Sequence, residues 1–165
     1  MNRRELRDHK YKILFFIDNY ADDEINQLID FYFSNLPIED EDDENTYVGN
    51  VSNYDFDSDI VKFTIKPDVE EIKDFIYLFK QKKHIIDKMI SDELIDWDIN
   101  RLPKEELNLL RLSIFEMYYE RDLDMPIAIN EAVLMSKIYG SSDKVSSFIN
   151  GILSKIYNKN NKKLI

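Results

Sequence analysis

Hydrophobic side chains recur at helical spacing along most of the chain. Apolar residues three or four positions apart mark one face of an α-helix. This spacing occurs in seven segments, which cover roughly residues 3–19, 22–34, 67–79, 85–94, 104–120, 126–139 and 145–158. Only three glycines and four prolines interrupt the 165 residues. The pattern predicts an all-α fold, a single-domain bundle of about seven helices over residues 1–165.

The first predicted helix combines an apolar stripe with basic residues. The stripe consists of Leu6, Ile13, Leu14 and Ile17. The basic residues, which we expect largely off this stripe, are Arg3, Arg4, Arg7 and Lys10. This arrangement predicts an amphipathic helix with a basic polar side.

Breaks in the periodicity separate the predicted helices. Pro37 ends the second helix, and Gly140 is expected to stop the sixth at its C′ position, before a loop over residues 140–144. Residues 38–59 are acidic and show no sustained period, which predicts a long mobile connection. Short extended pieces at 47–48 or 61–65 remain an alternative there.

The net charge is −11, and the charged residues are distributed unevenly along the chain. Residues 1–12 hold five basic and two acidic side chains, whereas residues 13–61 hold fourteen carboxylates and no Lys or Arg. A negative total disfavours nucleic acid, because phosphate binding depends on Lys and Arg. The local basic segment keeps such a partner open, and the acidic stretch suits a basic protein.

Several function classes are disfavoured by the residue types. The chain has no cysteine, and its two histidines, His9 and His84, are far apart, so we expect no metal site. The acidic run 39–44 lacks the Gly and Glu positions of a calcium loop. No phosphate loop or nucleophile motif occurs, so neither an enzyme nor a cofactor is expected. Without an apolar leader or span, we expect a soluble, cytoplasmic protein.

Motifs in the second half carry a family resemblance. In chain order they are Ile86-Asp87, Trp97, Arg101-Leu102, Leu110-Arg111-Leu112, Ile129-Asn130-Glu131-Ala132 and Phe148-Ile149-Asn150-Gly151. With the arginine-rich N-terminus, their order and spacing resemble the NusB family of transcription antitermination factors. The chain departs from the family pattern at Glu5, at Glu106-Leu107 and at Ser147, and it is about two residues shorter before Ile129.

The resemblance implies a function and a set of contact residues. It implies binding of boxA-type RNA together with NusE, a small-subunit ribosomal protein, within an RNA polymerase antitermination complex. The RNA-facing residues that it implies are Arg3, Arg4, Arg7, Lys10, Asp124, Met125, Pro126, Ser142 and Lys144. The residues that it implies for the protein partner are Phe15, Asp18 and Asp22. It leaves a homodimer open.

Other interpretations remain beside the RNA-binding one. A divergent module of this fold could bind a basic partner through its acidic face without RNA, whereas a stray methyltransferase-associated domain is disfavoured because no methyl-donor domain is present. Asn130 and Glu131 favour a structural role over a functional one, with Glu131 paired to Arg111. Ala132 and Gly151 are interpreted as small residues that let helices approach closely.

Overall fold

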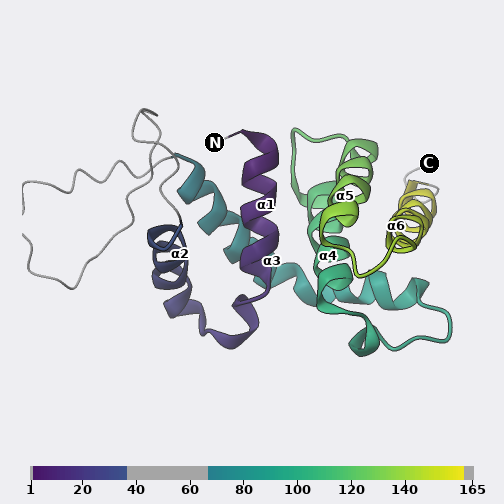
Figure 1. Cartoon of the computed structure of the whole chain (residues 1–165), viewed down its shortest axis with the longest axis horizontal. Coiled ribbons are helices and arrows are strands. Elements are labelled where there is room, and N and C mark those ends of the chain that lie inside the picture. The colour runs from purple at the N-terminus through teal and green to yellow at the C-terminus, as the bar shows by residue number, and fades with distance from the viewer. Residues whose placement is uncertain (1, 37–66, 162–165) are drawn as a thin grey trace, which may run out of the picture. The chain divides into compact units, whose positions relative to one another are not determined.

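The computed structural model describes residues 2–36 and 67–161, and every structural statement below refers to these residues. They form six α-helices and three short 3₁₀-helices (Figure 1). The all-α prediction is therefore confirmed. The acidic connection 38–59 and the extended pieces considered at 47–48 and 61–65 lie outside the described residues.

The chain divides into two compact units, Met1–Leu78 and Phe79–Ile165. The elements of the first unit are α1 (Arg3–Leu14), η1 (Ile17–Asn19), η2 (Asp22–Glu24), α2 (Ile25–Ser34) and the first part of α3 (Pro67–Glu93). Those of the second are the rest of α3, η3 (Ile99–Arg101), α4 (Lys104–Tyr119), α5 (Met125–Tyr139) and α6 (Val145–Asn161). That residues 1–165 act as one domain stays a prediction.

Helix α1 begins with a reciprocal cap. The Asn2 side chain accepts hydrogen bonds from the backbone N–H groups of Arg4 and Glu5, each at 3.0 Å, and Glu5 Oε2 accepts from the Asn2 N–H at 3.0 Å. Such a capping box satisfies N–H groups that a helix start leaves open. The helix ends at Leu14, before the predicted residue 19, and the 3₁₀-helix η1 follows.

The expectation that all four basic residues of α1 lie off the apolar stripe is wrong. Arg7 and Lys10 are 8% and 3% exposed and share the buried side of α1 with Leu6, Tyr11 and Leu14. Tyr11 widens the apolar stripe, and the methylene stems of Lys and Arg pack well on such a surface when their charged ends find partners. The exposed side of α1 instead mixes acidic and basic residues.

The predicted third and fourth helices are one 27-residue helix, α3. The polar stretch between them, Lys80-Gln81-Lys82-Lys83-His84, contains no Gly or Pro and consists mostly of good helix formers. A change in which side chains are buried does not by itself end a helix. This merging reduces the seven expected helices to six among the described residues.

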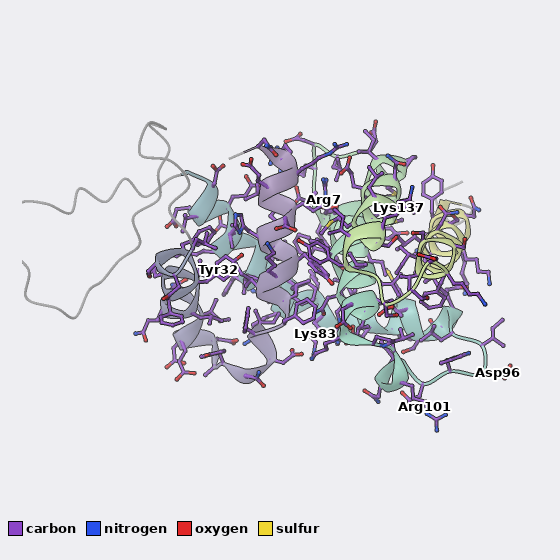
Figure 2. The ribbon with its side chains drawn as sticks, viewed as in Figure 1. Arg7, Tyr32, Lys83, Asp96, Arg101 and Lys137 are labelled. Atoms are coloured by element: carbon purple, nitrogen blue, oxygen red, sulfur yellow. The ribbon has the colours of Figure 1, made fainter. Side chains whose placement is uncertain are left out.

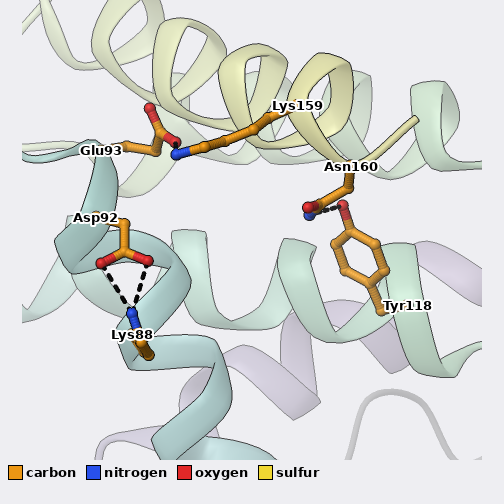
Figure 3. A network of polar contacts seen from close by, with 6 residues as sticks. All are labelled: Lys88, Asp92, Glu93, Tyr118, Lys159 and Asn160. Atoms are coloured by element: carbon orange, nitrogen blue, oxygen red, sulfur yellow. Dashed lines mark hydrogen bonds and ion pairs between the residues drawn. The ribbon is translucent and has the colours of Figure 1, made fainter. Parts of the chain in front are cut away.

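Helix α4 is the centre of the second unit, and α5 and α6 both pack against it. Every residue from Glu106 to Met117 is buried. Polar contacts join the helix ends: Lys159 Nζ lies 3.0 Å from Glu93 Oε1, and Asn160 Nδ2 donates to Tyr118 Oη at 2.8 Å (Figure 3). These contacts attach the end of α6 to α3 and α4.

Two glycines differ in their surroundings. Gly140 ends α5, but as its C-cap and not at the predicted C′ position, and its φ of −65° is not left-handed. A side chain there would clash with the Ser136 carbonyl oxygen and come within 3.0 Å of Val145 Cβ, so the position requires a glycine for space. Gly151 has no neighbour within 4 Å of an added Cβ, so its interpretation as a close-approach residue is wrong, whereas Ala132 is buried.

None of the helices in the described ranges is both long enough and apolar enough to cross a membrane.

Candidate nucleic-acid interface

The start of α1 presents two exposed guanidinium groups. Arg3 and Arg4 are exposed, and the Arg3 side chain keeps 75% of its surface accessible although its Nη1 lies 3.0 Å from Glu71 Oε1. The backbone N–H groups of a helix start add positive potential at this end. The two arginine forks form a surface suited to phosphate, whereas the Arg4 and Glu5 N–H groups already donate to the Asn2 side chain.

The other two predicted basic residues are placed differently. Lys10 Nζ lies 3.2 Å from Glu71 Oε1 and 5.2 Å from the centroid of the Phe75 ring. Since Arg3 and Lys10 share the same Glu71 oxygen, Lys10 helps to position the carboxylate that orients Arg3. Arg7 is buried, and Figure 2 shows it on α1.

The predicted RNA-facing residues of the second unit form two groups at opposite ends of α5. Asp124 is its exposed N-cap, followed by half-buried Met125 and exposed Pro126. Ser142 and Lys144 are exposed in the loop that follows α5. A 15-residue helix is roughly 20 Å long. The structure therefore does not bring the two groups together.

A buried carboxylate that sequence reasoning missed holds the loop after α5. Glu106, which is 3% exposed, accepts hydrogen bonds at Oε1 from the Ser141 backbone N–H at 3.2 Å and from the Ser141 hydroxyl. Its Oε2 is buried without a hydrogen-bond partner among the described residues. The only signal in the sequence was that Glu106 departs from the family pattern. Glu106 thus fixes the start of the loop that carries Ser142 and Lys144.

The residues expected to face a protein partner lie in and after α1. The Phe15 ring is half-buried and packs edge-on against Tyr11 at 5.2 Å between centroids, whereas Asp18 and Asp22 are exposed in η1 and η2. Between them, Phe16 and Tyr20 are 44% and 41% exposed, and sequence reasoning did not single them out. This part of the first unit therefore alternates accessible aromatic rings with carboxylates.

Two of the resemblance motifs meet in an ion pair. Arg111 Nε and Nη2 donate to the two Asp87 carboxylate oxygens at 2.8 and 2.9 Å, and Nη1 donates to Asn108 Oδ1 at 3.3 Å. Arg111 is 6% exposed. The structure thus gives this guanidinium an ion pair with Asp87, which sequence reasoning did not name. The pair joins α3 to α4 and has a structural role. The pairing with Glu131 that the sequence suggested stays a prediction.

His9 lies in an aromatic cluster of the first unit. Its Nδ1 lies 2.7 Å from Tyr32 Oη, and its ring also packs against Phe33. Burial lowers the pKa of His9 from its usual 6.5, and the nearby Lys12 lowers it further, whereas Asp8 and Glu5 act in the opposite direction. The neutral imidazole is therefore the form that the fold favours.

The helical fold, with exposed charged and aromatic side chains on both units, defines the class of an all-α helical protein. The profile of the NusB family matches residues 19–158. A transcription antitermination protein NusB from Lachnoclostridium phytofermentans is 31% identical over 157 residues, which cover 94% of this chain and 98% of that protein. One from Carboxydothermus hydrogenoformans is 45% identical over 73 residues, covering 44% of this chain and 50% of that protein.

A solved structure agrees with the sequence comparisons. The fold is similar to that of T. maritima NusB, with a TM-score of 0.68 and 27% identity over 94% of this chain and 90% of that one. The chain belongs to the NusB family of transcription antitermination proteins. Because this family is non-enzymatic, the expectation that the chain is not an enzyme is confirmed. Helix α1 precedes the residues that the family profile matches.

Proposed function

We propose that this protein supports transcription antitermination by binding boxA-type single-stranded RNA together with the ribosomal protein NusE, as part of a cytoplasmic RNA polymerase complex. Membership of the NusB family is the observation that carries this proposal. Residues 1–165 act in it as one RNA-binding domain. The RNA and the protein partner use different residues.

The RNA backbone is bound by the basic side chains that solvent can reach. Arg3 and Arg4 contact phosphates from the start of α1, and Lys144 does so from the loop after α5. Arg7 and Lys10 support Arg3 and Arg4 from the buried side of α1, since Lys10 holds the Glu71 carboxylate that also orients Arg3. A phosphate competes with Glu71 for Arg3. Because binding of the RNA backbone releases counterions, it weakens as salt is added.

Sequence preference comes from uncharged and acidic groups at the ends of α5. Phosphate contacts position an RNA, whereas contacts with base edges and faces specify its sequence. Met125 and Pro126 offer apolar surface to bases, Ser142 offers a hydroxyl, and Asp124 accepts hydrogen bonds from exocyclic amines or a 2′-hydroxyl. Because these groups stand at the two ends of α5, they contact separate nucleotides.

The protein partner binds the acidic and aromatic part of the first unit. Asp18 and Asp22 pair with basic side chains of NusE, while Phe15 provides apolar contact together with the exposed rings of Phe16 and Tyr20. Complementary charge favours a basic ribosomal protein at this surface over RNA.

An arginine substitution series tests the RNA contact. We expect Arg3→Ala combined with Arg4→Ala to weaken boxA binding in the presence of NusE by about tenfold, and to reduce the salt slope by about 0.7 for each phosphate that is no longer bound. Lys12→Ala is the matched control, because Lys12 is a half-exposed cation on the same helix that already pairs with Asp8 at 2.6 Å.

The same titrations distinguish the rival function. If NusE binds with unchanged affinity to the arginine and Lys12 variants while boxA and scrambled RNA bind equally weakly, the protein is an acidic interaction module without RNA. Asp18→Lys combined with Asp22→Lys would still be expected to lose NusE binding.

A further inference from the structure

The only tryptophan of the chain lies on the surface of the second unit. Trp97 is 63% exposed, and Ile95, two residues before it, is 72% exposed. Both stand in the loop between α3 and η3. Tryptophan is highly buried on average, and adjacent exposed apolar side chains commonly mark contact sites.

Hydrogen bonds hold this loop in a defined conformation. Asp96, before Trp97, has a left-handed backbone with a φ of 68°, a conformation that residues other than glycine adopt much less readily. The Asp98 side chain, after Trp97, accepts from the Asn100 N–H at 2.9 Å and caps η3. Further backbone bonds run from Leu94 N to Ser91 O, from Arg101 N to Asp98 O and from Leu102 N to Ile99 O. The exposure of Trp97 therefore belongs to an ordered turn.

The base of the loop is also fixed. Glu93, in the last turn of α3, pairs with Lys159 of α6, and Asp92 pairs with Lys88 at 3.0 Å (Figure 3). These two carboxylates already have cationic partners, whereas Asp96 and Asp98 form no ion pair with any residue in the described ranges. The residues immediately before and after Trp97 therefore each carry a negative charge that forms no ion pair within the described ranges.

This charge pattern selects among ligands. An RNA base stacked on Trp97 would bring its phosphates near Asp96 and Asp98, which is unfavourable. A Lys or Arg side chain is instead bound favourably at Trp97. The indole face attracts the cation, and the flanking carboxylates pair with it. Figure 2 shows Asp96 and Arg101 pointing away from the helices. Arg101 can pair with a carboxylate of the same partner.

We propose that residues 94–102 form a second protein-docking site, at which Trp97 and its flanking carboxylates receive an arginine or lysine from a basic segment of a partner protein. Ile95 adds apolar contact beside it. Tryptophan and arginine are the residue types most enriched where single side chains dominate an interface. This site shares no residue with the surface proposed for NusE, so it goes beyond the proposed function.

Binding at Trp97 can be followed by its fluorescence, because the chain has no other tryptophan. The full chain is titrated with a synthetic arginine-rich peptide, with the same peptide carrying glutamate for each arginine, and with a single-stranded RNA of equal length. We expect only the arginine peptide to shift Trp97 emission in a saturable way. Asp96→Asn combined with Asp98→Asn should weaken its binding about three- to tenfold.

Matched variants distinguish binding at this site from non-specific attraction of the peptide to an acidic protein. Asp74→Asn combined with Asp122→Asn removes the same two charges from positions elsewhere, and we expect less than a twofold effect. Trp97→Leu should weaken binding of a fluorescein-labelled arginine peptide, whereas Ile138→Ala, at another highly exposed side chain, should not. Unchanged Trp97 emission, equal losses in the two aspartate pairs, or saturation by RNA alone would each overturn the proposal.

Discussion

Three buried charged side chains have polar or aromatic partners, most of them on another element. Arg111 is enclosed by Asp87 and Asn108, Lys10 by Glu71 and the Phe75 ring, and Glu106 by Ser141. Removing a charge from water is costly unless hydrogen bonds and an opposite charge replace the lost hydration. These residues are therefore structural supports, and each should matter more to the free energy of unfolding than an exposed charge does.

The Arg111–Asp87 pair gives the first prediction. Asp87→Ala removes the carboxylate that binds a guanidinium of 7% side-chain exposure through two hydrogen bonds, so we expect the free energy of unfolding to fall by about 3 kcal/mol. Urea unfolding followed by circular dichroism measures it. Asp92→Ala, which removes an exposed pair with Lys88 on the same helix, should cost less than about 1 kcal/mol. Equal losses in the two variants would refute the structural role of the pair.

His9 makes part of the stability depend on pH. Its pKa is lowered from 6.5 in the fold, chiefly by burial, so below about pH 6.5 the unfolded chain takes up the proton more readily than the folded one. The His9 contribution is fully present above that pH and declines as the pH falls toward the folded-state pKa. We expect the loss of stability between about pH 7 and pH 5 to be smaller in His9→Gln, measured by urea unfolding. A slope identical to that of the unsubstituted protein would contradict this.

At the scale of elements, the helices whose bounds could be predicted from the sequence are those with a proline or glycine at an end. Helices α4, α5 and α6 lie within a few residues of their predicted ranges, because Pro103 and Gly140 mark natural limits. No such residue separates the two helices predicted between 67 and 94, so they form one. The buried side of α1 was misjudged because periodicity alone treats Lys10 as polar and ignores its apolar stem.

The two glycines of α5 and α6 give a matched test. Gly140→Ala places a methyl group against the Ser136 carbonyl and Val145, so we expect a loss of about 1–3 kcal/mol. Gly151→Ala adds a methyl group in open space inside α6, where alanine is a better helix former, so a gain of about 0.5–1 kcal/mol is expected. Thermal unfolding of the two variants should move in opposite directions. A shift in the same direction would mean that one of these environments is misassigned.

At the scale of the whole molecule, the family could be recognised from the order of its motifs, but the surfaces could not. The Ile86-Asp87 and Leu110-Arg111-Leu112 motifs turned out to meet in an ion pair, which no spacing rule predicts across 24 residues. The Glu106–Ser141 contact spans 35 residues, and the exposure of Trp97 depends on the fold around it. Sequence therefore supplied candidate contact residues, whereas the structure distinguishes buried supports from accessible groups.

We propose that this member of the NusB family binds boxA-type RNA together with NusE. The most direct measurement is the affinity for a short boxA RNA and for a scrambled RNA, each with and without NusE, across a series of salt concentrations. We expect boxA to bind more tightly than the scrambled strand, to require NusE for this preference, and to weaken steadily with salt. Equally weak binding of both strands under every condition would contradict the account.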